Sequence, residues 1–181
     1  MPRETDNPLI MVYDALWALA ESSSRLTDLV RLKNRIKFSQ TGQSSPVKED
    51  ISNADLPELI LVCTGGSGNL HNTSSTSSLT RRFEWIISTG DASISNKLLP
   101  VEWALYCAMI SSQATLGALR WPSGATDGFC KVMRMLDIET GQADAERNRG
   151  IAGWSSVWGV EVEMHFRSSD CVAVGEMGSG S

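Results

Sequence analysis

The residues that most resemble a ligand-binding motif are the Gly-Gly-Ser-Gly run at positions 65–68. A glycine-rich turn binds phosphate when it carries the Lys and Ser/Thr of a P-loop or opens onto a helix N-terminus. This run leads instead into a segment of Ser, Thr and Asn, and Asn69 stands where a G-x-S-x-G elbow needs its last glycine. We predict a plain glycine turn at residues 65–69. The alternative is a small ligand-binding domain or enzyme that uses the turn from Gly65 to Asn69.

Histidine and carboxylate side chains are the next candidates for chemistry. His71 lies in the Ser/Thr-rich segment and His165 on the polar side of a predicted strand, so they have neither metal-site spacing nor an H-E-x-x-H motif. Glu161 and Glu163 share one strand face, where such a pair can act as paired carboxylates but more often faces solvent. No nucleophile and base have a defined place together. The sequence therefore predicts no catalytic residue, no metal site, no cofactor and no enzyme activity.

Composition narrows the class of protein. The chain has 181 residues, 41% of them hydrophobic, and a net charge of -5. These values suit one domain with a proper core, and the acidic balance argues against binding nucleic acid by neutralising phosphates.

The four cysteines form no C-x-x-C pair; we interpret Cys63 and Cys107 as small buried thiols of a reduced, cytosolic protein. Neither a secretory signal nor a run of about 20 apolar residues, enough to span a membrane, is seen.

Two helices are predicted. Asn7 and Pro8 are typical of a helix start, and apolar residues then recur at helical spacing. A second part, residues 24–34, follows a break at three serines and ends in basic residues, which suit the negative end of a helix dipole. Residues 100–119 form the second helix, and its other faces are also largely apolar or small, so we expect burial on more than one side or contact with a neighbouring subunit. Its main stripe consists of Val101, Leu105, Ala108, Met109, Ser112 and Leu116.

Four strands are predicted from apolar patterns. Residues 59–63 form a continuous apolar run, and residues 79–88 alternate as a strand that pairs with it across a polar loop. Residues 131–138 and 157–166 form a second hairpin. In its last strand Val160, Val162, Met164 and Phe166 share the side that faces the core, while Gly159, Glu161, Glu163 and His165 share the polar side.

The connection between the last two strands is charged and almost free of apolar residues, so it extends into solvent or onto a partner. Trp154 and Trp158 follow it, and without interleaved basic residues they favour an apolar or intersubunit contact over stacking on bases. We assign an interface role to Asp144, Glu146, Arg147, Arg149, Trp154 and Trp158.

Together these elements predict an α+β fold. A mainly antiparallel sheet of about four to five strands packs against two helices, with a long projecting C-terminal hairpin. Residues 1–174 form the single domain. Residues 175–181 form a disordered Gly/Ser tail.

The element order resembles that of the tail-terminator and head-to-tail joining proteins of tailed bacteriophages. The resemblance lies in pattern and order and covers roughly the whole chain. It is carried by a leading helix from Tyr13 to Arg35 with a basic end, Leu56-Pro57-Glu58-Leu59-Ile60-Leu61-Val62, Arg82-Phe83-Glu84-Trp85-Ile86-Ile87-Ser88-Thr89-Gly90-Asp91, and the strand around Trp154 to Phe166.

The resemblance implies a structural subunit with no enzyme activity, located in the virion tail or neck after synthesis in the host cytoplasm. In that family the subunits commonly form a hexameric ring that caps the tail tube and docks the head. Its partners are then further copies, the tube protein and head-completion or connector proteins, while DNA passes through the lumen without specific binding. An acidic lumen suits that passage by like-charge repulsion. A different tail component, such as a baseplate adaptor, is the rival structural interpretation.

Overall fold

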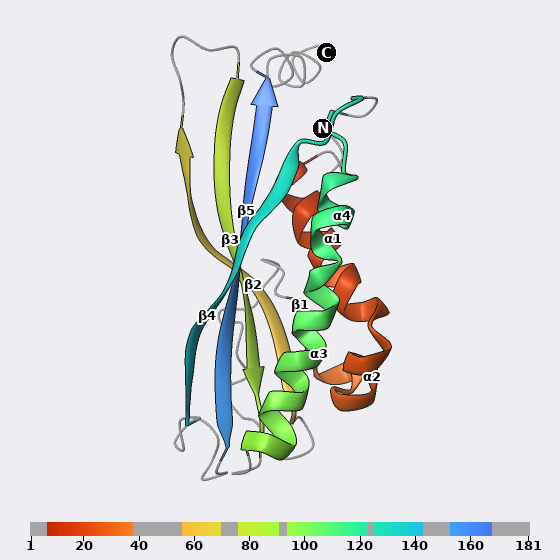
Figure 1. The fold of residues 1–181 in the computed structure, drawn as a ribbon, viewed down its shortest axis with the longest axis vertical. Coiled ribbons are helices and arrows are strands. Elements are labelled where there is room, and N and C mark those ends of the chain that lie inside the picture. The colour runs from red at the N-terminus through yellow and green to blue at the C-terminus, as the bar shows by residue number, and fades with distance from the viewer. Residues whose placement is uncertain are drawn as a thin grey trace, which may run out of the picture.

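The structure, a computed structural model, describes residues 7–37, 56–69, 76–90, 94–122, 125–142 and 153–167. Within these ranges the chain forms a five-stranded sheet with helices packed on one face (Figure 1). The strand order is β1-β2-β3-β5-β4, and neighbouring strands are antiparallel except β1 and β2, which are parallel. The predicted α+β class is confirmed. The expected Gly/Ser tail lies outside the described residues.

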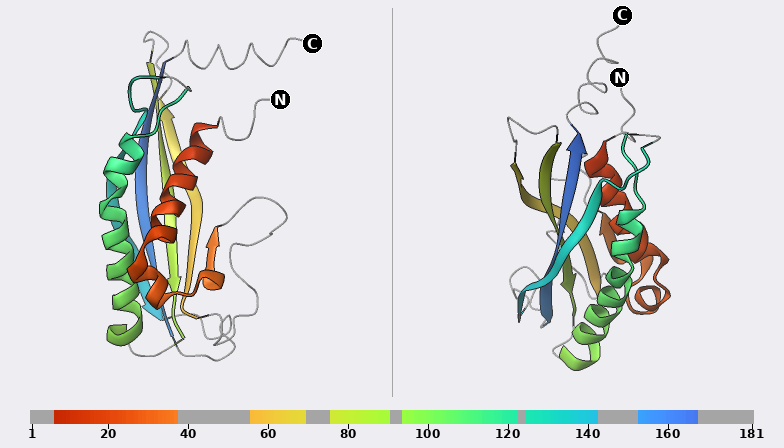
Figure 2. Two further views of the ribbon diagram at one scale, coloured as in Figure 1. Left: turned by 90° about the vertical axis from the view of Figure 1, so that its right-hand side faces the viewer. Right: turned by 45° about the horizontal axis from the view of Figure 1, so that its top comes forward.

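The strands are β1 (Arg35–Lys37), β2 (Glu58–Asn69), β3 (Thr76–Ser88), β4 (Cys130–Gln142) and β5 (Trp154–Arg167). The helices are α1 (Pro8–Ser22), α2 (Ser24–Leu29), α3 (Leu99–Ile110) and α4 (Ser112–Gly117), with a 3-10 turn at Leu32–Asn34 and a π-helical turn at Ile94–Leu98. Figure 2 shows α1 at one side of the helix layer and the α3–α4 rod at the other, both in front of the sheet.

The predicted start of α1 is confirmed at atomic level. The side-chain oxygen of Asn7 accepts a hydrogen bond from the amide of Leu9 at 2.9 Å, and Pro8 occupies the first helical position. The predicted break among the serines is also present, because Ser23 ends α1 and caps α2 by accepting from the amide of Leu26 at 3.4 Å. The second part of the helix ends at Leu29, earlier than the predicted residue 34.

Arg35 contacts the carboxyl end of α2 and that of α1. Its guanidinium donates to the carbonyl of Val30 at 3.0 and 3.1 Å and to that of Ala20 at 3.0 Å, so it binds the last turns of both α1 and α2. A further bond of 3.1 Å joins it to the Thr27 hydroxyl. Arg35 is 6% exposed. Burial lowers the pKa of Arg35, while the nearby charge of Glu21 raises it.

The core lies between the sheet and the helix layer, as the strand alternation predicted. The Tyr13 hydroxyl of α1 donates to the carbonyl of Leu61 at 2.7 Å, and Trp17 stacks on Trp85 with ring centroids 6.2 Å apart. The helices contribute Val12, Leu16, Ala20, Leu26, Val101, Leu105, Met109 and Leu116, and the sheet contributes Leu59, Leu61, Phe83, Trp85, Ile87, Val160, Val162 and Met164.

The predicted glycine turn is wrong. β2 continues through Gly65 to Asn69, paired with β3 along its length and interrupted by a bulge between Cys63 and Gly65. Gly66 is needed for close packing within the sheet, because a Cβ there would lie 2.3 Å from the carbonyl oxygen of Thr80. The glycines therefore allow close backbone approach inside a strand, and the hairpin connection lies beyond residue 69.

The second predicted hairpin is present and longer than expected. β5 lies between β3 and β4, so the described part of the hairpin belongs to the sheet. Residues 143–152, which connect β4 to β5 in the sequence, lie outside the described residues, and with them Asp144, Glu146, Arg147 and Arg149. The second predicted helix is divided at Ser111 into α3 and α4.

Candidate functional site

The outer face of α3 carries large apolar side chains that remain in solvent. Leu99, Trp103, Tyr106 and Ile110, which we call the α3 stripe, are between 41% and 63% exposed. They recur at helical spacing on the face opposite the buried core residues of the helix. The rings of Trp103 and Tyr106 stack with centroids 5.8 Å apart. The sequence predicted a helix apolar on more than one side, and the structure shows its second apolar face uncovered.

The α3 stripe contains no charge. Glu102 is the one charged residue of α3, and its carboxylate accepts a hydrogen bond of 3.2 Å from the indole nitrogen of Trp158 on β5. That contact turns Glu102 toward the sheet and leaves the outer face entirely apolar and aromatic. Such a composition, with Trp and Tyr together, is typical of the buried centre of protein interfaces.

The two tryptophans assigned to an interface lie elsewhere. Trp158 is partly buried against the core beneath α3. Trp154 is also partly buried, and its backbone amide and carbonyl both bond to Thr89, with the carbonyl accepting from the Thr89 amide at 2.8 Å. The structure does not bring either indole into the α3 stripe. Their interface role stays a prediction, as does that of Asp144, Glu146, Arg147 and Arg149, which lie outside the described residues.

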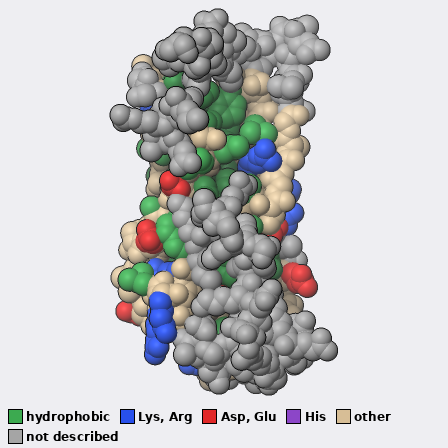
Figure 3. All heavy atoms as spheres, turned by 180° about the vertical axis from the view of Figure 1, so that it is seen from behind, with side chains coloured by type: hydrophobic (Ala, Val, Ile, Leu, Met, Phe, Trp, Pro, Cys, Tyr) green, Lys and Arg blue, Asp and Glu red, His purple; other side chains and the backbone are tan. Residues whose placement is uncertain are grey.

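The sheet face away from the helices carries cross-strand ion pairs. Arg134 on β4 contacts Glu161 on β5 at 2.6 Å, and Lys131 contacts Glu163 at 3.0 Å. His165 also lies 3.2 Å from the Glu163 carboxylate. Figure 3 shows one side of the molecule, on which acidic and basic side chains are interspersed. The predicted polar side of β5 is confirmed, and its carboxylates face cations rather than each other.

These pairs lower the pKa of both glutamates. The hydrogen bond from Arg134 lowers the pKa of Glu161, and the hydrogen bond from Lys131 lowers the pKa of Glu163. Both carboxyl groups are therefore ionised at neutral pH. A carboxyl group that serves as a general acid needs a raised pKa, whereas these two side chains form ion pairs with Arg134 and Lys131.

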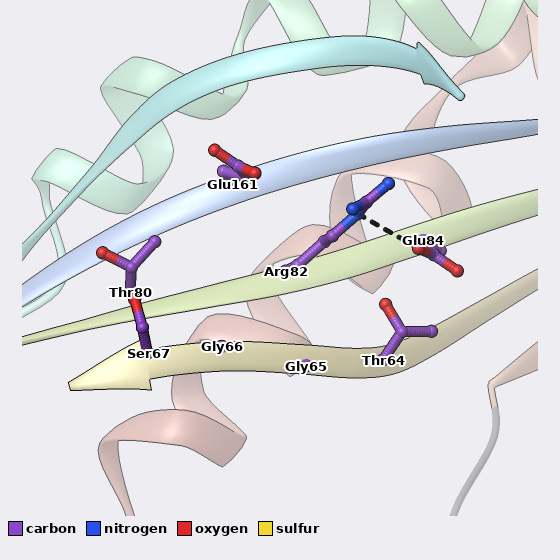
Figure 4. A pocket seen from close by; sticks show the side chains of 8 residues that line it. All are labelled: Thr64, Gly65, Gly66, Ser67, Thr80, Arg82, Glu84 and Glu161. Atoms are coloured by element: carbon purple, nitrogen blue, oxygen red, sulfur yellow. Dashed lines mark ion pairs between the residues drawn. The ribbon is translucent and has the colours of Figure 1, made fainter.

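A shallow pocket lies on the same face, beside the glycines of β2. Its volume is about 350 Å³. Arg82 of β3 lies within it and forms an ion pair of 3.1 Å with Glu84, and Glu161 stands on the neighbouring strand (Figure 4). The floor is mostly backbone and hydroxyl groups. The lining residues are Thr64, Gly65, Gly66, Ser67, Thr80, Arg82, Glu84 and Glu161. The arrangement can hold a small polar molecule.

The cysteines differ from their predicted environments. Cys63 was interpreted as a buried thiol and is exposed. Cys107 is partly exposed and accepts a hydrogen bond from Arg25 at 3.4 Å. Cys130 is buried, and burial raises the pKa of its thiol to about 11. Cys171 and His71 lie outside the described residues.

The part of the molecule that sequence reasoning missed is the upper part of the first hairpin. We call residues 62–69 of β2 and 78–84 of β3 the β2–β3 arm. Cys63, Thr64, Gly66, Ser67 and Gly68 are all exposed. Figure 1 shows this end of β2 on the side of the sheet away from the helices. The composition of this segment was a signal of its exposure, because a strand of Gly, Ser and Thr has no large apolar side chains to bury in a core.

Comparisons with known proteins add no family. No protein-family model matches the chain, and no curated protein matches it either. Within the described ranges, no three His, Cys, Asp or Glu side chains are grouped so that they could hold a metal ion. Among the helices that the structure describes, none is both long and apolar enough to cross a membrane.

Proposed function

We propose that this chain is a structural subunit of a bacteriophage tail that forms a homo-oligomeric ring, a hexamer, which caps the tail tube and joins it to the head. The observation that carries the proposal is the α3 stripe. Large exposed apolar patches usually mark interaction sites, and Trp and Tyr are the residues that most often dominate binding energy. The observed order of helix, hairpin, helix and hairpin is also the order on which the resemblance to tail terminators rests.

The position of the α3 stripe is compatible with the proposed ring. The α3–α4 rod occupies one side of the helix layer, and α4 packs against the edge strand β4 (Figure 2). In a ring the stripe of one copy contacts a different surface of the next copy. Contacts of that kind close into rings when the rotation between copies allows it.

The proposed partners follow from the proposed place in the virion neck. They are further copies of the chain, the tail tube protein and head-completion or connector proteins, met after synthesis in the host cytoplasm. DNA passes through the lumen without specific binding, which suits a chain with a net charge of -5. The proposal requires no cofactor and no membrane.

The test measures association of the purified chain, alone and with tail tubes, by light scattering and negative-stain imaging. Trp103→Asp should weaken association by roughly 30-fold or more, as expected for an interface hot spot. Its stability should change by less than about 0.5 kcal/mol, because the side chain is exposed. Gln113→Asp, exposed on α4, is the matched control and should leave association unchanged. A protein that stays monomeric at every concentration and in the presence of tubes would rule out the ring.

A second candidate function is small-molecule binding at the pocket beside Gly65. The observation that favours it is the Arg82 guanidinium placed among hydroxyl groups and carboxylates in a hollow of about 350 Å³. A panel of small anions and polar metabolites should then raise the melting temperature of the wild type and not of Arg82→Ala.

A tail or baseplate adaptor is the rival structural role. Negative-stain images of particles that carry labelled protein distinguish it from a terminator by where the label lies on the particle.

A further inference from the structure

A short turn after α2 carries an exposed leucine between two cations. Arg31, Leu32 and Lys33, which we call the basic turn, are all exposed. Leu32 is 63% exposed, and no large apolar side chain in the described ranges is more exposed. A single exposed leucine is common on protein surfaces. This one is distinguished by how firmly its backbone is held and by the surface on the same chain that it complements.

The basic turn is held between buried anchors. Val30 before it is fully buried, and Asn34 after it is 1% exposed. The amide of Asn34 donates to the carbonyl of Arg31 at 2.9 Å and closes the turn. Arg35 then fixes the carbonyl of Val30 with bonds of 3.0 and 3.1 Å. A contact surface whose backbone is already fixed loses little conformational entropy on binding.

The α3 stripe has the chemistry that complements this turn. Its leucine and isoleucine offer an apolar surface to Leu32, and Trp103 and Tyr106 are 59% and 41% exposed. The two rings stack at an interplanar angle of 23° and so present one aromatic surface. Cations, and arginine most often, bind the faces of such rings. Because the stripe carries no cation of its own, it does not repel the two cations of the basic turn.

The two surfaces lie toward opposite edges of the described sheet. The basic turn leads into β1, the outermost described strand at one edge. α4, which follows α3 in the chain, packs against β4, the outermost described strand at the other edge. The left view of Figure 2 shows the α3–α4 rod at one side of the helix layer and the turn before β1 at the other. Different surfaces at two sides of a subunit suit contact between successive copies.

We infer that the α3 stripe of one copy binds the basic turn of the next copy. Leu32 packs on the apolar part of the stripe, and Arg31 and Lys33 lie over the rings of Trp103 and Tyr106. A second copy is the occupant because the chain itself carries the cation-flanked apolar turn that this uncharged aromatic surface fits. The inference rests on the proposed ring and names the contact that would build it.

A single contact of this kind should be weak. The stripe and one short turn bury less than the roughly 1,000 Å² expected of a stable interface. Closing a ring adds a last contact without recruiting a further copy, so closed rings should form more readily than isolated pairs. Association of the wild type should therefore rise steeply with protein concentration.

Mixing two complementary variants tests the contact. Leu32→Asp disrupts the basic turn and leaves the stripe intact, whereas Trp103→Asp disrupts the stripe and leaves the turn intact. Each variant alone should associate at least about tenfold more weakly than the wild type. An equal mixture should form a dimer with one copy of each variant and grow no further, because one intact stripe still meets one intact turn. Sedimentation at up to about 1 mM, with one variant isotope-labelled for mass analysis, detects this dimer.

Two further variants separate the role of the cations from that of any added charge. Arg31→Ser combined with Lys33→Ser should weaken association about threefold or more, as expected for the loss of cation–π contacts. Ala18→Asp, exposed on α1, adds the same charge as Leu32→Asp and should change association less than about twofold. Circular dichroism checks that each variant is folded.

The outcomes distinguish this contact from the ring itself. If Leu32→Asp associated like the wild type while Trp103→Asp did not, the basic turn would not be the occupant, although the ring could stand. If both variants lost association and their mixture formed no dimer, the stripe would pair with itself or with another molecule, and the inference would be wrong. A wild type that stayed monomeric at every concentration and with tail tubes would exclude the ring and this contact together.

Discussion

The indole nitrogen of Trp158 donates a hydrogen bond of 3.2 Å to the carboxylate of Glu102, and this bond joins β5 to α3. It fixes how α3 is rotated on the sheet. With Glu102 held inward, the adjacent Trp103 projects outward at 59% exposure, since successive helix residues point about 100° apart. The contact in the interior therefore determines which face of α3 is available to a partner.

Removing the Glu102 carboxylate should leave α3 less firmly held against the sheet. Glu102→Ala is expected to cost about 1–2 kcal/mol in the free energy of unfolding, because a partly buried indole N–H loses a charged acceptor. Glu102→Gln keeps an oxygen acceptor at the same place and should cost less than about 1 kcal/mol. Urea denaturation followed by tryptophan fluorescence measures both. Equal stabilities for the alanine variant and the wild type would contradict this account of α3.

Gly66 and Gly65 provide a matched pair of substitutions in β2. Gly66→Ala should cost about 1–3 kcal/mol, since its Cβ would meet the backbone oxygen of Thr80 at 2.3 Å and that backbone belongs to the paired strand. Gly65→Ala should change stability by less than about 0.5 kcal/mol, because nothing lies within 4 Å of its Cβ. Thermal unfolding of the two variants measures the contrast. Similar melting temperatures would mean that β2 does not pair with β3 in this register.

Arg35 should be among the most sensitive charged positions. Arg35→Met is expected to cost about 3 kcal/mol, because the substitution leaves the carbonyls of Ala20 and Val30 without their donor. Arg35→Lys retains the charge but lacks the planar fork that reaches both carbonyls. Its free energy of unfolding should therefore lie between that of the wild type and that of Arg35→Met. Lys33→Met is the control on the exposed surface nearby and should be neutral. Chemical denaturation ranks the three variants.

The ion pair on the open sheet face gives a pH dependence of known sign. The pKa of Glu161 lies below its ordinary value of 4.5, so its contribution to stability is fully present above 4.5 and is lost as pH falls through the lowered value. Arg134→Ala should raise the pKa of Glu161 toward 4.5, as measured by carbon NMR of the side-chain carboxyl. Lys131→Ala should move the pKa of Glu163 and leave that of Glu161 nearly in place. An unchanged Glu161 titration in Arg134→Ala would show that the pair does not form in solution.

The alternation of residues predicted the two strands at the centre of the sheet. Phe83, Trp85 and Ile87 on β3 and Val160, Val162 and Met164 on β5 all face the helices, because each strand is buried on one side and wet on the other. The start of α1 was equally readable, since the cap at Asn7 depends on local bonds alone. Features set by neighbours in the sequence were thus predictable.

Features set by distant neighbours were not. Gly65 and Gly66 are typical of a turn in isolation, and it is pairing with Arg81 and Arg82 on β3 that keeps them extended. Cys63 has an apolar sequence context and is nevertheless exposed in the folded chain. The buried role of Arg35 depends on two helix ends that the chain brings together only on folding. The α3 stripe was predictable in part: the sequence showed that this face of the helix is apolar, but not that it is exposed.

The place of β5 between β3 and β4 has a consequence for biosynthesis. Every other described element precedes β5 in the chain, so the ribosome releases β3 and β4 before the strand that separates them. Until residues 154–167 emerge, the inner edges of both strands lack their native neighbour and are open to pairing with other nascent chains. Closure of the sheet must then join residues far apart in sequence, which makes folding slow compared with that of the local helices. Crowded synthesis, as on polysomes, is therefore the stage at which this protein is most exposed to aggregation.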